Sequence, residues 1–424
     1  MFKTQCQMPA HRRGFAVLAA ASAGTVLASA GLGATASFAS LAPRRPTAVL
    51  VALHTRAVPN GGVYSFGVVD SFGRLMVLGH ATPEPVSGIG GRVTQIAASN
   101  SNGYALTADG KVWAWGAGGQ GELGSGATPR FSDKAVAVRF PPGVRIAALA
   151  NPMPFDAGLA IDTKGDVWGW GANTGHALCL PDTGPVVTPR RLPLRDVTLA
   201  TGARSHSLFL AHGRVVACGD NAAGDLGNGT LRPSARPTPV VGLPGGHVVD
   251  LVSSWQGSGA LMANGACFDW GFNAQGQLGD GTTRNSPVPV RVHLSAAVER
   301  VFQGGSNAAN GQTLAMLANG SIWAWGDGTW GQLGNGTYRS SARPVRVRTP
   351  RGVRFTNVAT GGYASYAIAR SGALWSWGSN RFGQLGDGSR QLARAIPRSI
   401  GLSASEIVST DLNVVAYGIS RHRA

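Results

Sequence analysis

Acidic residues that recur between glycines are the first candidates in this sequence for a catalytic or metal-binding role. Asp280, Asp327 and Asp387 each stand between two glycines, and carboxylates in such clusters can act as general acids or metal ligands. The glycine-rich context also suggests a phosphate-binding loop, but no Gly-Lys-Ser/Thr follows it. Because these acids recur in loop-like contexts, we interpret them as hydrogen-bond acceptors within turns.

The remaining catalytic signals are weak. The nine His are scattered, and neither a His-Glu-x-x-His nor a Gly-x-Ser-x-Gly motif occurs. Catalysis would therefore need residues brought together from distant segments, which spacing alone does not exclude. The sequence predicts a protein that is not an enzyme, with no catalytic residues, no metal site and no cofactor.

Tryptophan pairs are the residues that recur most regularly. Segments of the form Val-Trp-Ala-Trp-Gly occur six times, with substitutions, and a weaker copy ends at Gly79. A residue that recurs at one place in every repeat usually packs between repeats, so we expect a structural core rather than a stacking platform for bases or sugars. The Trp residues assigned to this core are Trp113, Trp115, Trp168, Trp170, Trp270, Trp323, Trp325, Trp375 and Trp377.

The elements that position these residues are short strands. A turn such as Asp109-Gly110 or Asn319-Gly320 precedes most Trp segments, and such pairs favour tight hairpins because they tolerate a positive φ. An apolar run and a proline-interrupted run complete each unit, and proline is confined to sheet edges because it cannot donate to a ladder. The terminal glycines lie 37 to 55 residues apart, which is typical of four-stranded propeller blades.

A second motif follows most hairpins and carries a resemblance to a known family. Gly-[Gln/Glu/Asp]-Leu-Gly occurs at residues 121–124, 224–227, 276–279, 331–334 and 383–386. These copies resemble the repeat of the regulator of chromosome condensation, including bacterial proteins described as α-tubulin suppressor-like, over about residues 60–420. The resemblance implies an all-β, seven-bladed β-propeller of four-stranded antiparallel blades. The copy at residues 175–179 departs from the pattern, so its loop should be altered.

The N-terminus predicts export. Arg12-Arg13-Gly14-Phe15 precedes a weakly hydrophobic stretch of small residues, as in a twin-arginine signal peptide. We expect a cleavable signal at residues 1–39 and a single seven-bladed propeller at residues 40–424, its last blade closed by N- and C-terminal strands. The mature chain should be periplasmic or extracellular and should keep no stable membrane span; an uncleaved anchor is the alternative.

Charge and cysteines add two expectations. The formal charge is +17, mostly from 33 Arg that are spread singly between repeats, so we interpret them as a solvated surface and expect no nucleic acid partner, with polyanion binding as the alternative. Beyond the signal, Cys179, Cys218 and Cys267 remain. Three cysteines cannot form a disulfide framework, so we expect small buried hydrophobic side chains.

The proposed binding face holds the loops whose residues vary between repeats. Strand order places the first and third loops of every blade at one end, and aromatic or Arg side chains there are typical binding anchors.

Among relatives, the resemblance implies a GTPase exchange factor and a secreted bacterial propeller that grips β-lactamases; export argues against the first. We predict a monomeric protein-binding module, with a glycan- or cell-wall-binding propeller and a propeller lyase as alternatives. The predicted partner-binding residues are Arg204, His206, Trp255, Trp330, Tyr363, Arg381 and Phe382.

Overall fold

The fold is that of a computed structural model, which describes residues 48–49, 63–67, 83–99, 101–307, 310–381, 384–389, 391–404, 406–409, 413–417 and 420–421. The predicted export signal lies outside the described residues. The signal, its cleavage and the domain boundary at residue 40 therefore stay predictions.

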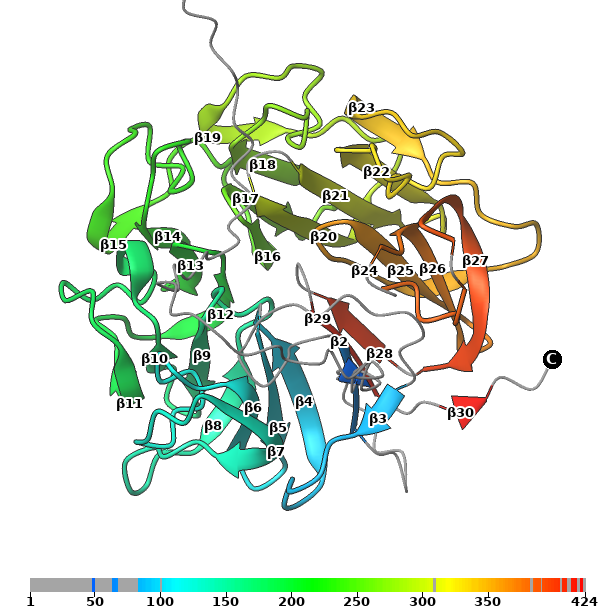
Figure 1. Cartoon of the computed structure of the whole chain (residues 1–424). Helices are drawn as coiled ribbons and strands as arrows, with labels where there is room; N and C mark the ends of the chain where they lie inside the picture. Colours follow the sequence, from blue (N-terminus) through cyan, green and yellow to red (C-terminus); the bar gives the residue numbers. More distant parts are fainter. Residues whose placement is uncertain are drawn as a thin grey trace, which may run out of the picture. The chain divides into compact units, whose positions relative to one another are not determined.

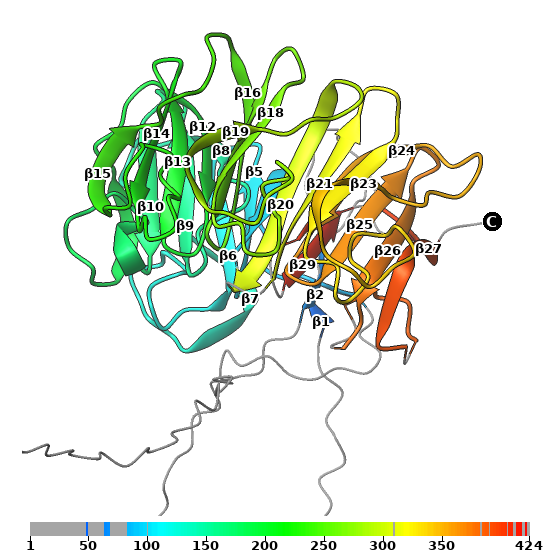
Figure 2. The same cartoon turned by 90° about the horizontal axis from the view of Figure 1, so that it is seen from above.

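Six blades of four consecutive antiparallel strands make up most of the described chain. Figure 1 shows the blades placed one after another around an axis, and Figure 2 shows the same strands turned by 90°. We call the strands of a blade A to D from the axis outward. The strands are, blade by blade, β4 Val93–Ala98, β5 Asn102–Thr107, β6 Val112–Ala117 and β7 Phe131–Ala137; β8 Ile146–Leu149, β9 Ala157–Asp162, β10 Val167–Gly171 and β11 Val186–Arg191; β12 Val197–Gly202, β13 His206–Ala211, β14 Arg214–Gly219 and β15 Ser234–Pro239; β16 Val248–Ser254, β17 Gly257–Met262, β18 Cys267–Gly271 and β19 Ser286–Arg291; β20 Val298–Asn307, β21 Asn310–Leu317, β22 Ile322–Gly326 and β23 Ser341–Arg346; β24 Phe355–Thr360, β25 Ala364–Ala369, β26 Ala373–Ser379 and β27 Ala393–Ser403. Each blade contacts the next along the chain, through β4 and β8, β9 and β12, β12 and β16, β16 and β20, and β20 and β24.

The expectation of seven four-stranded blades is wrong, because only six sheets among the described residues follow this plan. The remaining strands form a sheet of a different kind, in the order β1 (Ala48–Val49), β3 (Pro83–Pro85), β2 (Val63–Gly67), β29 (Asn413–Tyr417) and β28 (Glu406–Ser409). It contains a parallel pair, β1 with β3, and it joins the two ends of the chain through the antiparallel pair β2 and β29. It contacts β4 and β24, and β30 (Ser420–Arg421) adds to the edge of β27.

The Trp before the last glycine of the motif joins its blade to the preceding one in the second, fourth, fifth and sixth blades. Trp170, Trp270 and Trp377 are fully buried, whereas the first Trp of a pair retains more exposure in several blades. Their indole N–H groups donate to backbone oxygens in the Gly-x-Leu-Gly loop of the preceding blade, each at 2.9 Å from nitrogen to oxygen: Trp170 to Glu122, Trp270 to Asp225 and Trp377 to Gln332. The two repeated motifs are therefore halves of one contact between blades.

Two separate constraints at this contact require glycine at the last position of the Gly-x-Leu-Gly loop. Gly227 has a φ of +63°, which side chains disfavour. A Cβ atom added there would also lie 2.6 Å from Nε1 of Trp270. Gly334 stands in the same relation to Trp377, with a φ of +64° and the same 2.6 Å approach. Backbone conformation and packing thus select the same residue.

A disulfide replaces this contact between the second and third blades. Cys179 bonds to Cys218 with an S–S distance of 2.04 Å. Cys218 occupies the position of the second Trp, and Cys179 that of the last loop glycine, because the N–H of Leu178 donates to Asn173 Oδ1 as that of Leu226 does to Asn221. The expectation that these cysteines are merely buried hydrophobes is wrong; Cys267 alone of the three stays a free, buried thiol.

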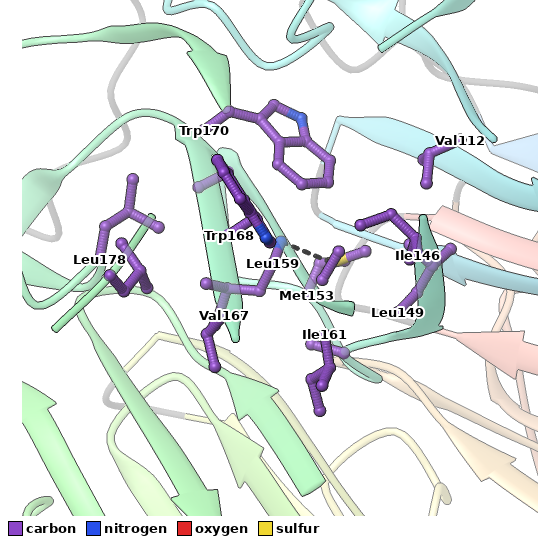
Figure 3. Close-up of a cluster of buried hydrophobic side chains, with 14 of the residues drawn as sticks. Val112, Ile146, Leu149, Met153, Leu159, Ile161, Val167, Trp168, Trp170 and Leu178 are labelled. Carbon is purple, nitrogen blue, oxygen red and sulfur yellow. Dashed lines mark hydrogen bonds between the residues drawn. The ribbon is translucent and has the colours of Figure 1, made fainter. Parts of the chain in front are cut away.

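Apolar side chains from neighbouring blades fill the space between the sheets. In the cluster drawn in Figure 3, Val112 of the first blade faces Ile146 and Leu149 of the second. Trp170 belongs to the same cluster and lies on β10, which pairs with the strand β9 that carries Leu159. The Leu159 N–H group lies 3.2 Å from Met153 Sδ, so the loop carrying Met153 is attached to this core. The core therefore runs between blades and positions the loops at their ends.

The turn acidic residues have the role predicted for them. Oδ1 of Asp280 accepts the Thr282 N–H at 2.8 Å, and Oδ1 of Asp387 accepts the Ser389 N–H at 3.0 Å. Asp327 accepts the Thr329 N–H in the same way. These contacts confirm the interpretation as turn acceptors.

Candidate functional site

The loops between strands A and B meet the loops between C and D at one end of the blades, because all four strands are antiparallel. Near the axis at this end lies a pocket of about 40 Å³. Five consecutive blades, from the second to the sixth, each contribute at least one residue to its wall: Phe155, Arg204, Trp255, Gly304 and Thr360. The pocket is thus the place where segments far apart in sequence converge.

The A–B loop of the second blade is longer than its counterparts. It spans residues 150–156, whereas the corresponding loops of the third and fourth blades are residues 203–205 and 255–256. The Met153 N–H donates to Ala98 O at 3.1 Å and the Phe155 N–H to Ala203 O at 3.0 Å. These bonds attach the long loop to the blades on both sides and carry Phe155 over the third blade.

Phe155, Trp255 and Arg204 form a stack beside the pocket, which we call the axial triad. The Phe155 and Trp255 rings meet edge to face, with centroids 5.5 Å apart and planes at 89°. Cζ of Arg204 lies 3.9 Å from the centroid of the Trp255 ring. Both rings are half-buried and Arg204 is exposed. A rigid aromatic surface next to a guanidinium is the composition typical of an interface anchor.

A carboxylate lies close to the triad. Burial raises the pKa of Asp156, while a hydrogen bond from the Ser101 hydroxyl and the charge of Arg204 act in the opposite direction. Ser101 Oγ and Asp156 Oδ1 are 3.5 Å apart. The negative charge of Asp156 therefore interacts with Arg204, whose side chain remains exposed.

The structure brings together only part of the predicted face. Arg204 and Trp255 touch, as described, but His206 is fully buried in strand B, where its Nε2 lies 2.9 Å from Ser258 Oγ. Burial lowers the His206 pKa to about 4. Placing His206 on the binding surface was wrong, because strand B is covered on both faces by neighbouring blades.

The other predicted residues lie on the fifth and sixth blades. Trp330 is half-buried in a C–D loop, and its N–H donates to Gln332 Oε1 at 2.8 Å. Tyr363 is half-buried in an A–B loop and Arg381 is exposed in a C–D loop. Phe382 lies outside the described residues. Phe155 was missed by sequence reasoning; the signal that could have found it is the extra length of its loop.

Neither a metal-binding cluster nor a membrane-spanning helix occurs among the described residues. Within those ranges, no three His, Cys, Asp or Glu side chains are grouped so that they could hold a metal ion. No described helix has the length and apolar character needed to cross a membrane.

Comparison with known proteins identifies the repeat. Two family profiles, both described as the regulator of chromosome condensation (RCC1) repeat, match residues 264–309, 319–368 and 371–411, and residues 93–122 and 355–384. The chain is 30% identical over 311 residues to the mitochondrial RCC1 domain-containing protein RUG3 of Arabidopsis thaliana, which covers 66% of this chain and 68% of that protein.

Other relatives include a plant receptor of similar identity and a much larger ligase. The ultraviolet-B receptor UVR8 of Arabidopsis thaliana is 32% identical over 67% of this chain and 65% of its own length. The mouse E3 ubiquitin-protein ligase HERC2 is 26% identical over 71% of this chain, but the match spans only 6% of that ligase.

Solved structures share the fold. Human WBSCR16 superposes with a TM-score of 0.72 at 20% identity, covering 84% of this chain and 98% of that one. Prp20p of Saccharomyces cerevisiae gives a TM-score of 0.71 at 19% identity, covering 88% and 94%. With the matched repeats and the RUG3 relative, the chain belongs to the family of proteins built from regulator of chromosome condensation repeats.

Proposed function

We propose that this propeller is an exported binding module that holds a protein partner against its A–B loop end. The axial triad of Phe155, Trp255 and Arg204 is the centre of the contact, and Trp330, Tyr363 and Arg381 are its periphery. The module performs no catalysis of its own.

The observation that carries the proposal is the axial triad itself. An Arg stacked on a half-exposed Trp, which is in turn held by a second ring, offers apolar area and charge at little cost in side-chain freedom. The pocket beside it, at about 40 Å³, is too small for most ligands. The surface therefore suits a protein partner better than a small substrate.

Distant structures of the same fold support this class of function. Prp20p of Saccharomyces cerevisiae binds Gsp1p and histones, and a second structure holds the same yeast protein bound to Kap60. At 18 to 19% identity these structures share only the fold with this chain. They favour protein binding without naming a partner.

The disulfide supports export. Cys179 and Cys218 are both buried at the contact between two blades, and structural disulfides are typical of proteins that reside in oxidising compartments. This agrees with the predicted signal around Arg12-Arg13. Replacing both arginines by Lys should retain the chain in the cytoplasm; unchanged export would contradict the twin-arginine route.

The test compares capture by the wild-type chain with capture by Trp255→Ala. Immobilised protein is exposed to periplasmic and culture-supernatant proteins and, separately, to purified wall glycans. Trp255→Ala should lose the protein that wild type retains, whereas Ile396→Ala, which removes an exposed side chain on the outermost strand β27, should retain it. Equal capture by both variants would contradict the proposed face, and retention of wall glycans alone would favour a glycan-binding propeller.

A further inference from the structure

Positive charge is concentrated in one part of the propeller. Residues 81–280 contain 14 basic and 14 acidic residues, whereas residues 281–400 contain 14 Arg against only three acidic residues. Of these three, Asp327 is buried and Asp387 pairs with Arg394. The expectation of an evenly spread charge is therefore wrong, and the last two blades, yellow to orange in Figure 1, hold the excess.

The charge is densest between the fifth and sixth blades. The segment Arg346-Val-Arg-Thr-Pro-Arg-Gly-Val-Arg354 connects β23 to β24, and all four of its Arg side chains are exposed. The exposed Arg370 lies beside it, because the Arg370 N–H donates to Arg354 O at 2.7 Å. We call Arg346, Arg348, Arg351, Arg354 and Arg370 the linker cluster. Its backbone leaves strand D at the end of the blades opposite the A–B loops, since D–A linkers and B–C turns share that end, while the Arg348 guanidinium lies against Gly336 of the C–D loop.

The repeat does not require this cluster. Residues 137–145 form the corresponding linker of the first blade: the N–H groups of Arg139 and Arg348 donate to equivalent carbonyls, of Gly124 and Gly334. In that linker Ala137 and Pro142 stand where the cluster has Arg346 and Arg351. The extra arginines are thus an individual feature of this linker and not part of the blade architecture.

The cluster is also uncompensated within the described part of the chain. None of the ion pairs found there involves its five guanidinium groups. Several exposed guanidinium groups on one short segment create a local positive potential that attracts anionic ligands. Guanidinium forks bind carboxylate, sulfate and phosphate groups through paired hydrogen bonds.

We infer that the linker cluster binds a flexible anionic polysaccharide. Residues 346–354 contain no aromatic side chain that could stack on bases, which disfavours single-stranded nucleic acid. A chain of repeated charges on a flexible backbone fits arginines that follow a bent linker.

The test measures the affinity of the full chain for a short heparin oligosaccharide as a function of salt. In the cluster variant, Arg346, Arg348, Arg351 and Arg354 are all changed to Gln. In the matched control, the exposed Arg92, Arg139, Arg214 and Arg232 are changed to Gln. Both variants lose the same net charge, so they separate a local site from a general electrostatic effect.

The cluster variant should lose at least roughly tenfold in affinity at physiological salt, and the slope of log K against log salt should fall by about one for each contact removed. The control should stay within about twofold of wild type. Equal losses in both would overturn the site, and so would failure of the wild type to bind heparin. Tighter, cluster-dependent binding of duplex DNA or oligo-dT would overturn the polysaccharide in favour of nucleic acid.

Two further measurements keep the result interpretable. If the fourfold variant unfolds, the Arg346/Arg348 and Arg351/Arg354 double variants take its place, and each should lose part of the affinity. Trp255→Ala should bind heparin like wild type, because Trp255 packs against Phe155 and Arg204 and not against the arginines of the linker cluster. The anionic-ligand site at the linker cluster and the proposed protein-binding face can therefore be tested independently.

Discussion

Two chemically different kinds of Trp occur at the residue scale. Trp255 is half-buried, supported by Phe155 and covered by Arg204, whereas Trp325 is fully buried between blades. The first has a free edge that a partner can use. The second has none, so its removal can only affect folding.

Alanine variants should separate these two roles. Trp255→Ala should weaken partner binding by about 2 kcal/mol or more while changing thermal stability little. Trp325→Ala should cost about 3 to 5 kcal/mol of unfolding free energy because it leaves a large cavity. Calorimetry and partner titration check both, and a Trp255 variant that unfolds like the Trp325 variant would show that the triad is structural.

Asp269 is an unusual residue inside the fourth blade. It stands between Phe268 and Trp270, where other repeats have Ala, Gly or Ser, and it is fully buried. Burial raises its pKa to about 8, although hydrogen bonds from Trp325 and Gln303 act in the opposite direction. The Gln303 Nε2 and Asp269 Oδ1 atoms are 2.9 Å apart.

This carboxyl should make stability depend on pH. Its pKa is higher in the folded chain than the ordinary 3.8, so the folded state holds the proton more tightly and stability falls as pH rises from about 4 to about 8. The slope can approach about 1.4 kcal/mol per pH unit. Asp225, whose pKa burial raises to about 7, acts in the same direction.

Asp269→Asn should reduce that slope and stabilise the chain at pH 8. Its amide can accept from Trp325 and, once the Gln303 amide turns over, donate to Gln303 Oε1, which has no hydrogen-bond partner within the described part of the chain. Denaturant melts at pH 5 and pH 8 measure the effect, with the exposed Asp133→Asn as control. A slope identical to wild type would show that Asp269 does not control it.

At the scale of elements, neighbouring blades meet at the same position in two chemically different ways. Most contacts pair a loop Gly with a buried Trp, as Gly227 does with Trp270. Between the second and third blades a disulfide replaces this pair. A small covalent bridge there compensates for the apolar area that the missing indole would have buried.

Removing the bridge should therefore destabilise the propeller. The cysteines are 39 residues apart, and closing a loop of that length contributes about 4 kcal/mol in the chain-entropy description. Cys179→Gly/Cys218→Ala should melt earlier than wild type and lose all sensitivity to reductant. Cys267→Ala, which removes the free thiol, should keep that sensitivity. If reductant leaves the wild-type melt unchanged, the bridge is not stabilising.

At the scale of the whole molecule, strands from both ends of the chain share one sheet between the first and sixth blades. Val63 lies opposite Tyr417 and Gly67 opposite Asn413. β29 pairs along one edge of β2 there, and β28 and β29 contact β4 and β24; strand edges that are left open promote aggregation. The ends of the chain therefore matter to the stability of all the blades.

Deleting residues 406–424 should expose these edges, lower the melting temperature and promote aggregation. Deleting only residues 422–424, which leaves every described strand in place, is the control. Light scattering and a thermal melt would decide the outcome. A truncated chain that stays monomeric and melts like wild type would contradict a closing role for β28 and β29.

The family, the four-stranded antiparallel blade, the burial of the second Trp of each motif and the turn role of Asp280 and Asp387 could be predicted from the sequence, because these depend on local pattern repeated along the chain. Only the tertiary structure decided the number of regular blades, the burial of His206, the Cys179–Cys218 bridge and the meeting of Phe155 with Trp255 and Arg204. Each of these depends on which residues of different blades come into contact. That is set by how the sheets stack around the axis, which repeat spacing does not encode.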